Sequence, residues 1–228
     1  PTLVHIPAAA APIALLHNLP AKSQLYLSPT TAAKIFAGEI TRWNDPAIAK
    51  DNNRSVTEVT YKKDRNGDLV KDAKGNAVVL RTAKKNINYT LPNQPITVIY
   101  RSDKSGTSGN FTAWLRGVAP ATWTKPQNDT FVTAFPGNIN APGNIDRIVG
   151  ASSSTGVAQL AAKTKYSITY SEVSYGTKYN LKTTAVGNAS GNFALPTGDA
   201  TAAFLGSATV DAKGIFKFDY ATKETGAY

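Results

Sequence analysis

One stretch of the sequence, residues 96–115, constrains the fold more than any other. It begins with an apolar, β-branched run at residues 96–100, which is typical of a buried strand. A loop of hydroxyl, glycine and charged residues follows at 101–109, and large apolar residues then recur at helical spacing. The pattern predicts a strand, a tight turn and a helix that begins near Thr107 or Ser108.

A strand that leads through a turn into a helix can offer free backbone N–H groups to an anion. The first N–H groups of a helix lack partners within the helix, and the helix dipole adds partial positive charge there. Ser105 and Thr107 add hydroxyl donors, and Gly106 lets the backbone approach a ligand closely. Arg101 adds a planar fork that fits a tetrahedral oxyanion, and Asp103 is placed to hold that guanidinium. The same residues could also do no more than cap a helix.

A close resemblance to one family is carried by residues 101–112, which run Arg-Ser-Asp-Lys-Ser-Gly-Thr-Ser-Gly-Asn-Phe-Thr. This segment resembles a motif of the substrate-binding proteins of phosphate ABC transporters, which are type II periplasmic binding proteins. Residues 27–48 resemble a second segment of the same family, in the same order along the chain, and weaker similarity continues to near Tyr179. The loop is not the phosphate loop of nucleotide hydrolases, because no Gly-Lys-Ser/Thr ends it.

The resemblance implies a binding protein and not an enzyme. It implies an extracytoplasmic protein that binds inorganic phosphate and passes it to an ABC permease. It also implies that four residues contact phosphate and that two more support them, namely Arg101, Ser105, Gly106 and Thr107, with Asp103 and Ser108 in support. Neither a cofactor nor a metal ion is expected, since cysteine is absent and the two histidines, His5 and His17, have no ligand-type neighbours in the sequence.

In this family two lobes enclose the ligand, and the resemblance covers the second lobe almost alone. No stretch of the chain matches the loops of the first lobe, which in the family supply hydroxyl groups and a carboxylate. We therefore expect residues 1–228 to form a single α/β lobe with a central, mostly parallel sheet flanked by helices. The resemblance implies that the first lobe comes from elsewhere in the same chain or from another chain.

The basic charge of the chain is concentrated in one segment. The net charge is +10, and residues 54–85 hold nine Lys or Arg against four acidic residues, which gives net +5. Apolar alternation and turn signals such as Asn66-Gly67 predict a β-hairpin inserted at residues 56–82. Only Tyr61 is an aromatic residue among these charges. The segment therefore indicates a solvated, lysine-rich strand pair and not a nucleic-acid surface.

Two other functions stay open. A phosphoryl-transfer enzyme could use Ser105 or Thr107 beside Arg101, but no general base or metal cluster accompanies them in the sequence. A binding-protein lobe could also be reused as a structural or surface-assembly protein, which the basic hairpin and the unmatched first lobe favour.

The sequence predicts two further loops. Residues 150–156 form a second hydroxyl-rich loop before a predicted helix, and this loop is either a secondary site or a simple helix cap. Residues 120–142, rich in Pro, Asn, Thr and Gly, are predicted to form a surface loop.

Overall fold

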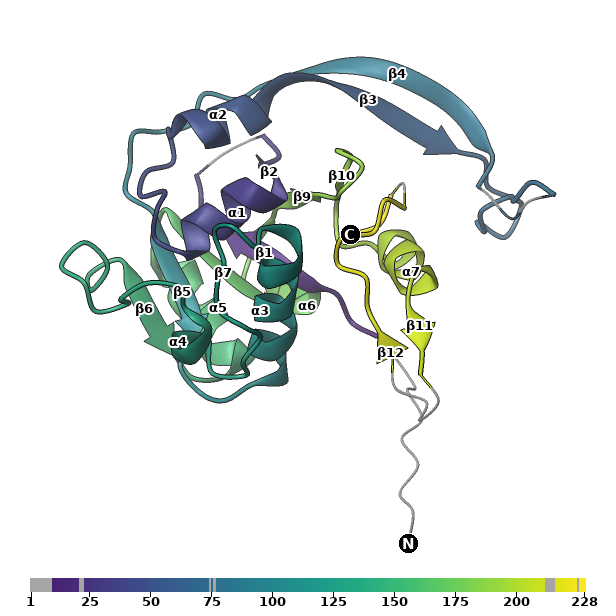
Figure 1. The fold of residues 1–228 in the computed structure, drawn as a ribbon. Helices are drawn as coiled ribbons and strands as arrows, with labels where there is room; N and C mark the ends of the chain where they lie inside the picture. The colour runs from purple at the N-terminus through teal and green to yellow at the C-terminus, as the bar shows by residue number, and fades with distance from the viewer. Residues whose placement is uncertain (1–9, 21–22, 74, 76, 212–215, 225) are drawn as a thin grey trace, which may run out of the picture.

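A five-stranded sheet forms the centre of the lobe (Figure 1). The computed structural model describes residues 10–20, 23–73, 75, 77–211, 216–224 and 226–228. The sheet has the order β6-β5-β7-β1-β8, with bounds Ile148–Ala151, Thr97–Arg101, Ser167–Glu172, Ile13–His17 and Lys182–Thr183. β5 is parallel to β6 and to β7, whereas β1 is antiparallel to both β7 and β8. Four of the five strands therefore run the same way, which confirms the predicted α/β lobe.

Helices cover both faces of this sheet. On one face α1 (Pro29–Phe36) and α3 (Gly106–Val118) pack with Leu15 of β1 in the larger apolar cluster. On the other face α5 (Ser153–Lys163) packs with Ala14 and Leu16 in a second cluster. Neighbouring residues of β1 thus point to opposite faces, as the pleat of a strand requires. The shorter helices are α2 (Pro46–Asn52), α4 (Phe131–Ala134), α6 (Val173–Lys178) and α7 (Gly198–Gly206).

Aromatic rings fill the larger cluster around Tyr170. Its ring stacks on Phe111 with centroids 4.2 Å apart and lies 5.8 Å from Phe131. Phe131, together with Trp123 and Phe135, comes from the stretch predicted as a surface loop, and all three are fully buried or nearly so. The stretch is mostly irregular, as predicted, but a surface position is wrong for these three residues. Aromatic residues spaced irregularly among Pro, Asn and Gly give no periodic signal, although each buries a large apolar ring.

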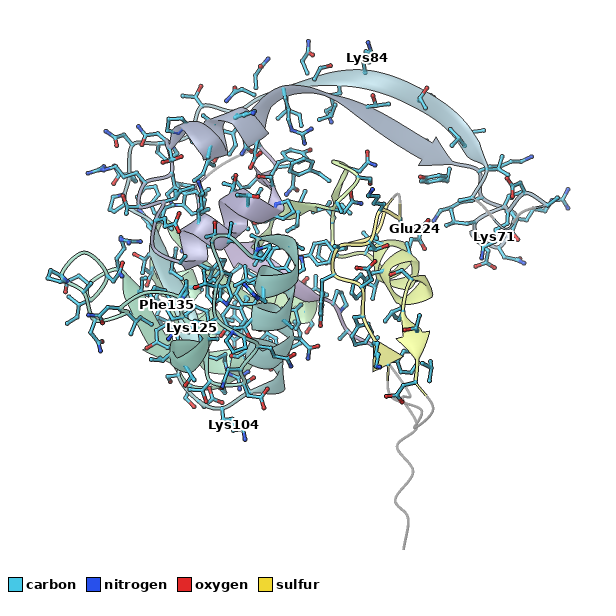
Figure 2. The ribbon with its side chains drawn as sticks, viewed as in Figure 1. Lys71, Lys84, Lys104, Lys125, Phe135 and Glu224 are labelled. Carbon is cyan, nitrogen blue, oxygen red and sulfur yellow. The ribbon has the colours of Figure 1, made fainter. Side chains whose placement is uncertain are left out.

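The predicted hairpin is present and extends well away from the body of the lobe (Figure 1). Its strands are β3 (Asn53–Tyr61) and β4 (Val79–Asn88), so it reaches beyond the predicted bounds of 56–82 at both ends. The prediction fell short because residues 83–88 carry no β-branched residue except Ile87. Figure 2 shows Lys71 in the tip of the hairpin and Lys84 on its outer curve, where the Lys84 side chain points away from the body. We call residues 53–88 the arm.

Two small sheets complete the fold. β2 (Tyr26–Leu27), β9 (Ala185–Gly187) and β10 (Phe193–Ala194) form a three-stranded sheet of order β10-β9-β2. β11 (Thr209–Val210) pairs with β12 (Phe216–Lys217) beside α7. Within the described residues, no helix is both long enough and apolar enough to cross a membrane.

Candidate functional site

The strand, loop and helix predicted from the sequence meet at one end of the sheet. β5 ends at Arg101, and α3 begins at Gly106 with Ser105 as its N-cap. The Oγ of Ser105 accepts a hydrogen bond from the N–H of Thr107 at 3.1 Å. The cap places the helix start one residue before the predicted one, since Gly106 follows the capping serine directly. Because β5, β6 and β7 are parallel, the residues that follow their carboxyl ends meet at this same edge.

Asp103 holds the guanidinium of Arg101 in a fixed orientation, as the sequence predicted. Arg101 Nε donates to Asp103 Oδ1 at 2.8 Å, and Nη2 donates to Oδ2 at 2.6 Å. This bidentate pair raises the pKa of Arg101 and holds the pKa of Asp103 far below its usual value. The Arg101 side chain is 11% exposed, so the cation lies at the surface of the site without being surrounded by water.

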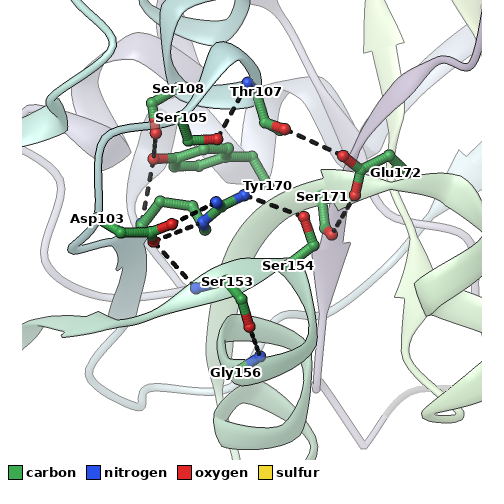
Figure 3. A network of polar contacts seen from close by, with 11 residues as sticks. Asp103, Ser105, Thr107, Ser108, Ser153, Ser154, Gly156, Tyr170, Ser171 and Glu172 are labelled. Atoms are coloured by element: carbon green, nitrogen blue, oxygen red, sulfur yellow. Dashed lines mark hydrogen bonds and ion pairs between the residues drawn. The ribbon is translucent and has the colours of Figure 1, made fainter.

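The second hydroxyl-rich loop joins this pair. Ser153 donates its backbone N–H to Asp103 Oδ1 at 2.9 Å, and Arg101 Nη1 donates to Ser154 Oγ at 3.0 Å. Figure 3 shows this loop at the start of α5, directly against Asp103. Ser153 has φ 66°, a left-handed conformation that is costly for a residue other than glycine and that often marks functional sites. The structure therefore brings the loop at residues 150–156 into contact with the loop at residues 101–109.

Sequence reasoning did not assign Tyr170 to the site. Its hydroxyl accepts a hydrogen bond from the backbone N–H of Arg101 at 3.2 Å and shares another with Ser108 Oγ at 2.7 Å. Burial raises the pKa of Tyr170 to about 12, so the hydroxyl stays neutral. Tyr170 thus ties the end of β5 to the first turn of α3, and Ser108 joins this network through its contact with Tyr170.

Glu172 is a second residue that sequence reasoning did not assign to the site. Its Oε1 accepts a hydrogen bond from Thr107 Oγ at 3.0 Å, and its Oε2 accepts one from Ser171 Oγ at 3.1 Å (Figure 3). Burial by itself would raise the pKa of Glu172. Hydrogen bonds from its own backbone N–H and from the hydroxyls of Ser154, Thr107 and Ser171 outweigh that effect and lower the pKa. Glu172 is the last residue of β7, so it lies at the edge of the sheet where the parallel strand β5 also ends.

Several donors of the site stay available to a ligand. Asp103 and Ser154 engage three of the five N–H groups of the Arg101 guanidinium, which leaves two. The Ser105 hydroxyl accepts from Thr107 and keeps its own proton to donate. A Cβ placed on Gly106 would meet no atom within 4 Å, so the backbone there faces open space. Among the described residues, the N–H of Gly106 has no hydrogen-bond acceptor.

An apolar cavity of about 270 Å³ lies apart from these groups, between α3, β1 and the C-terminal segment. Its walls include Trp114, Phe204 and Tyr228, and no charged side chain lines it. A charged oxyanion would lose its hydration there without gaining a partner. The polar network around Arg101 is therefore the candidate site, and this cavity is not.

Comparison with known proteins places the chain in a family. A sequence profile of the PBP superfamily domain matches residues 1–224. The phosphate-binding protein PstS 2 of Mycobacterium tuberculosis is 34% identical over 170 residues, which are 75% of this chain and 34% of that protein. PstS of Pasteurella multocida is 29% identical over 199 residues, which are 86% of this chain and 45% of that protein. The chain spans less than half the length of these relatives.

Solved structures agree at the level of the fold. A high-affinity periplasmic phosphate-binding protein, PfluDING, determined with bound phosphate, superposes with a TM-score of 0.59 at 22% identity over 89% of this chain and 45% of its own. An ancestral soluble variant of the human phosphate binding protein superposes with a TM-score of 0.61 at 19% identity over 92% of this chain and 48% of its own. The chain therefore belongs to the PBP superfamily, and it is similar there to one lobe of PstS-like phosphate-binding proteins.

Proposed function

We propose that this chain binds inorganic phosphate, as one lobe of the substrate-binding component of a phosphate ABC importer. The observation that carries the proposal is the Arg101 guanidinium, oriented by Asp103 beside the capped N-terminus of α3. The proposed phosphate contacts are those predicted from the sequence, namely Arg101, Ser105, Gly106 and Thr107, supported by Asp103 and Ser108. The names of the relatives support the same ligand.

The chemistry of this constellation suits a tetrahedral dianion. Two free guanidinium N–H groups form a planar fork, and a fork binds two oxygens of one phosphate better than a point charge does. The helix N-terminus adds backbone donors and partial positive charge on the same side. Each charge-assisted hydrogen bond contributes roughly 1.5–3 kcal/mol.

The partners and the location follow from the proposed role. An importer's binding protein works outside the cytoplasm and delivers its ligand to a membrane permease. The second lobe of the pocket would come from the same chain or from another one, since this chain spans less than half of its relatives. A basic arm of net charge +5 adds mild attraction for anions at long range.

A calorimetric titration of the chain with phosphate tests the proposal. We expect a saturable heat that Arg101→Ala abolishes or strongly reduces. Absence of any saturable binding at millimolar phosphate would overturn it. We also propose that the chain is no enzyme, and turnover of a chromogenic phosphate ester, lost in Arg101→Ala, would contradict this.

A structural or surface-assembly role is the second candidate, and the arm favours it. β3 and β4 form a two-stranded sheet of their own, so each has an outer edge that pairs with no third strand among the described residues. Such an edge can accept a strand from another chain. Size-exclusion chromatography with light scattering tests this role, because assembly through the arm predicts a mass above 24.2 kDa that rises with concentration.

A further inference from the structure

The tip of the arm is built from a tandem repeat. Residues 63–70 and 71–78 share an eight-residue pattern, with Lys-Asp at the first two positions, Gly at the fifth and Val at the eighth. In both units the first residue pairs with the seventh. The glycine N–H also donates to the carbonyl oxygen of the aspartate, at 3.1 Å in the first unit and 3.0 Å in the second. The two glycines, Gly67 and Gly75, have φ of 90° and 84°, which favours glycine at both turns.

Three backbone hydrogen bonds close the tip into a ring. Lys62 N–H donates to Val78 O at 2.8 Å, and Val78 N–H donates to Val70 O at 2.8 Å. Val70 N–H then donates to Lys62 O at 2.9 Å. Each of the three segments is therefore held by both of the others. The tip is a folded unit that presents its side chains in a defined arrangement.

This tip presents cations around two exposed apolar side chains. The ladder pairs Arg81 and then Val79 with consecutive residues of β3, so it passes over Leu80. A β-bulge of this kind redirects side chains. Leu80 is 64% exposed and Val79 is 50% exposed. Four exposed cations belong to the same part of the arm, namely Lys62, Arg65, Lys71 and Arg81.

The far part of the arm is accessible and strongly basic. Residues 62–85 hold eight Lys or Arg against three acidic residues, so the whole net charge of +5 lies there. Lys63 turns toward α7, where it pairs with Asp199 at 3.4 Å. Lys84 instead points away from the body (Figure 2). Because the arm projects from the lobe (Figure 1), a broad surface can reach its exposed cations and apolar side chains.

We propose that the tip of the arm binds the surface of a lipid bilayer that contains anionic phospholipids. Exposed Lys and Arg side chains attract anionic headgroups, and apolar side chains between them enter the interface. Nucleic acid fits less well, because Tyr61 is the only aromatic residue available to stack on bases and Leu80 would stay in water. An arm that holds the lobe at a bilayer would keep it near the membrane permease of the proposed function.

Co-sedimentation of the unaltered chain with vesicles tests this proposal. At about 0.1 M NaCl we expect at least tenfold stronger binding to vesicles of equal parts phosphatidylcholine and phosphatidylglycerol than to vesicles of phosphatidylcholine alone. Binding should fall at least tenfold at about 1 M NaCl, where the Debye length is about 3 Å instead of about 10 Å. Equal binding to the two kinds of vesicle would overturn the proposal.

Neutral variants separate the tip from the net charge of the chain. The triple variant Lys62→Gln, Lys71→Gln and Arg81→Gln lowers the net charge from +10 to +7 and should weaken binding to the anionic vesicles at least tenfold. A matched control reaches the same net charge by replacing with glutamine three exposed lysines outside the arm, namely Lys125, Lys163 and Lys165. The control should bind within twofold of the unaltered chain. An equal loss in both triple variants would show that the tip has no special part in binding.

The apolar side chains have a test of their own, because the chain contains no cysteine. Leu80→Cys provides a single site for an environment-sensitive NBD label, and Ile145→Cys is the matched control, since Ile145 is 57% exposed and lies outside the arm. The emission of the label at position 80 should shift to the blue on anionic vesicles, whereas that at position 145 should not. Heparin, a polyanion without a bilayer, should shift neither. A label at position 80 that stays in water on bound vesicles would reduce the contact to charge attraction and overturn the proposal.

The bilayer contact and phosphate binding can fail separately. None of the substituted residues belongs to the network around Arg101, so each variant should bind phosphate as the unaltered chain does. If the triple tip variant does not fold, as judged by its thermal transition, the lipid and salt dependence of the unaltered chain and the label at position 80 still decide. A chain that binds no phosphate but binds anionic vesicles through the tip would refute the proposed function and support this inference.

Discussion

At the scale of single residues, the site depends on which hydrogen-bonding groups are already engaged. Arg101 donates three of its N–H groups to Asp103 and Ser154, and these hydrogen bonds fix the plane of the guanidinium in which the other two N–H groups lie. A lysine has no such plane, because its ammonium donors rotate freely about one axis. The orientation of the fork, and not only its charge, is therefore what the loop provides.

We predict that Arg101→Ala weakens phosphate binding at least tenfold, because about 1.5–3 kcal/mol is lost with a charged hydrogen-bond partner. Arg101→Lys should also weaken it, since the charge is kept but the fork is lost. Isothermal titration calorimetry measures both effects. Arg42→Ala is the matched control, because Arg42 is exposed and its Nη1 donates to Asn93 Oδ1 at 2.8 Å, away from the site. Unchanged affinity in Arg101→Ala would exclude the proposed role of Arg101.

A second residue-scale prediction concerns His17, which has no ligand-type neighbours in the sequence. The side chain is buried, its Nδ1 accepts from the N–H of Leu19 at 3.3 Å, and among the described residues its Nε2 has no partner. Burial, reinforced by the charge of Lys182, lowers the pKa of His17 from 6.5 to about 3. His5, the other histidine, lies outside the described residues.

The folding stability should depend on pH, because His17 binds a proton more readily in the unfolded chain than in the folded one. Below pH 6.5 the unfolded chain protonates His17 while the folded chain does not, so stability falls as the pH falls toward 3. Between pH 7.5 and pH 5 the loss should be about 2 kcal/mol, a range in which ordinary carboxyl groups stay mostly ionised. Urea unfolding at the two pH values measures it. His17→Gln should remove most of the difference, and an equal difference in both proteins would refute this assignment.

At the scale of elements, a substitution at the start of α3 can distinguish an effect on folding stability from an effect on ligand binding. The φ of Gly106 lies outside the left-handed region and a Cβ there meets no atom, so alanine fits the folded backbone. An alanine at this position faces the space that the anion would occupy. If phosphate binds as proposed, the ligand and not the helix requires glycine at this position, because alanine is favoured in a helix by up to about 1 kcal/mol.

We therefore predict that Gly106→Ala keeps or slightly raises the melting temperature and weakens phosphate binding at least tenfold. Differential scanning calorimetry and phosphate titration of the same sample give the two results. Gly198→Ala is a matched control, since Gly198 also begins a helix and a Cβ there also meets no atom within 4 Å. A variant that binds phosphate as the unaltered chain does would show that no ligand approaches Gly106.

The arm is the second element whose contribution can be isolated. Only Ile87 of β4 is buried, and an ion pair between the arm and α7, Lys63 with Asp199 at 3.4 Å, is exposed on both sides. Exposed ion pairs contribute little to stability. Figure 2 also shows Lys84 of the arm and Lys104 of the site loop at opposite ends of the molecule.

We predict that replacing residues 56–85 with an Asn-Gly turn between Ser55 and Asn86, which face each other in the ladder, leaves the lobe folded. The deletion removes eight basic and four acidic residues, so the net charge falls from +10 to +6. The free energy of unfolding should change by no more than ~1 kcal/mol, and phosphate affinity should stay within twofold at physiological salt. A loss of binding would instead assign the arm to the site.

At the scale of the whole molecule, every donor of the proposed site comes from this one lobe. An anion held by the α3 terminus and Arg101 keeps its other face in water, and hydrogen bonds exposed to water contribute little net free energy. A second lobe would add donors and exclude that water. Affinity is therefore a property of the assembled pocket more than of this lobe.

We predict that the 228-residue chain alone binds phosphate with a dissociation constant on the order of 1 mM, worth roughly 4 kcal/mol. Adding the other lobe, in the same chain or as a second chain, should tighten binding by several decades. Equilibrium dialysis with labelled phosphate at physiological salt measures both states. Micromolar binding by this chain alone would show that residues 1–228 already enclose the anion.

The sequence by itself determined the parts of the site whose contacts are local. Asp103 is two residues from Arg101, and Ser105 is two residues from Thr107, so the ion pair and the helix cap are encoded within one loop. Strand, cap and helix signals then place Gly106 at a helix terminus without reference to the rest of the fold.

Only the tertiary structure decided the remaining contacts of the site. Ser154 lies 53 residues from Arg101, Tyr170 lies 62 residues from Ser108, and Glu172 lies 65 residues from Thr107. These residues meet because β5, β6 and β7 are adjacent and parallel, and strand order is set by packing of the whole sheet and not by any local pattern. The direction of the Thr107 proton therefore became visible only when Glu172 was placed beside it.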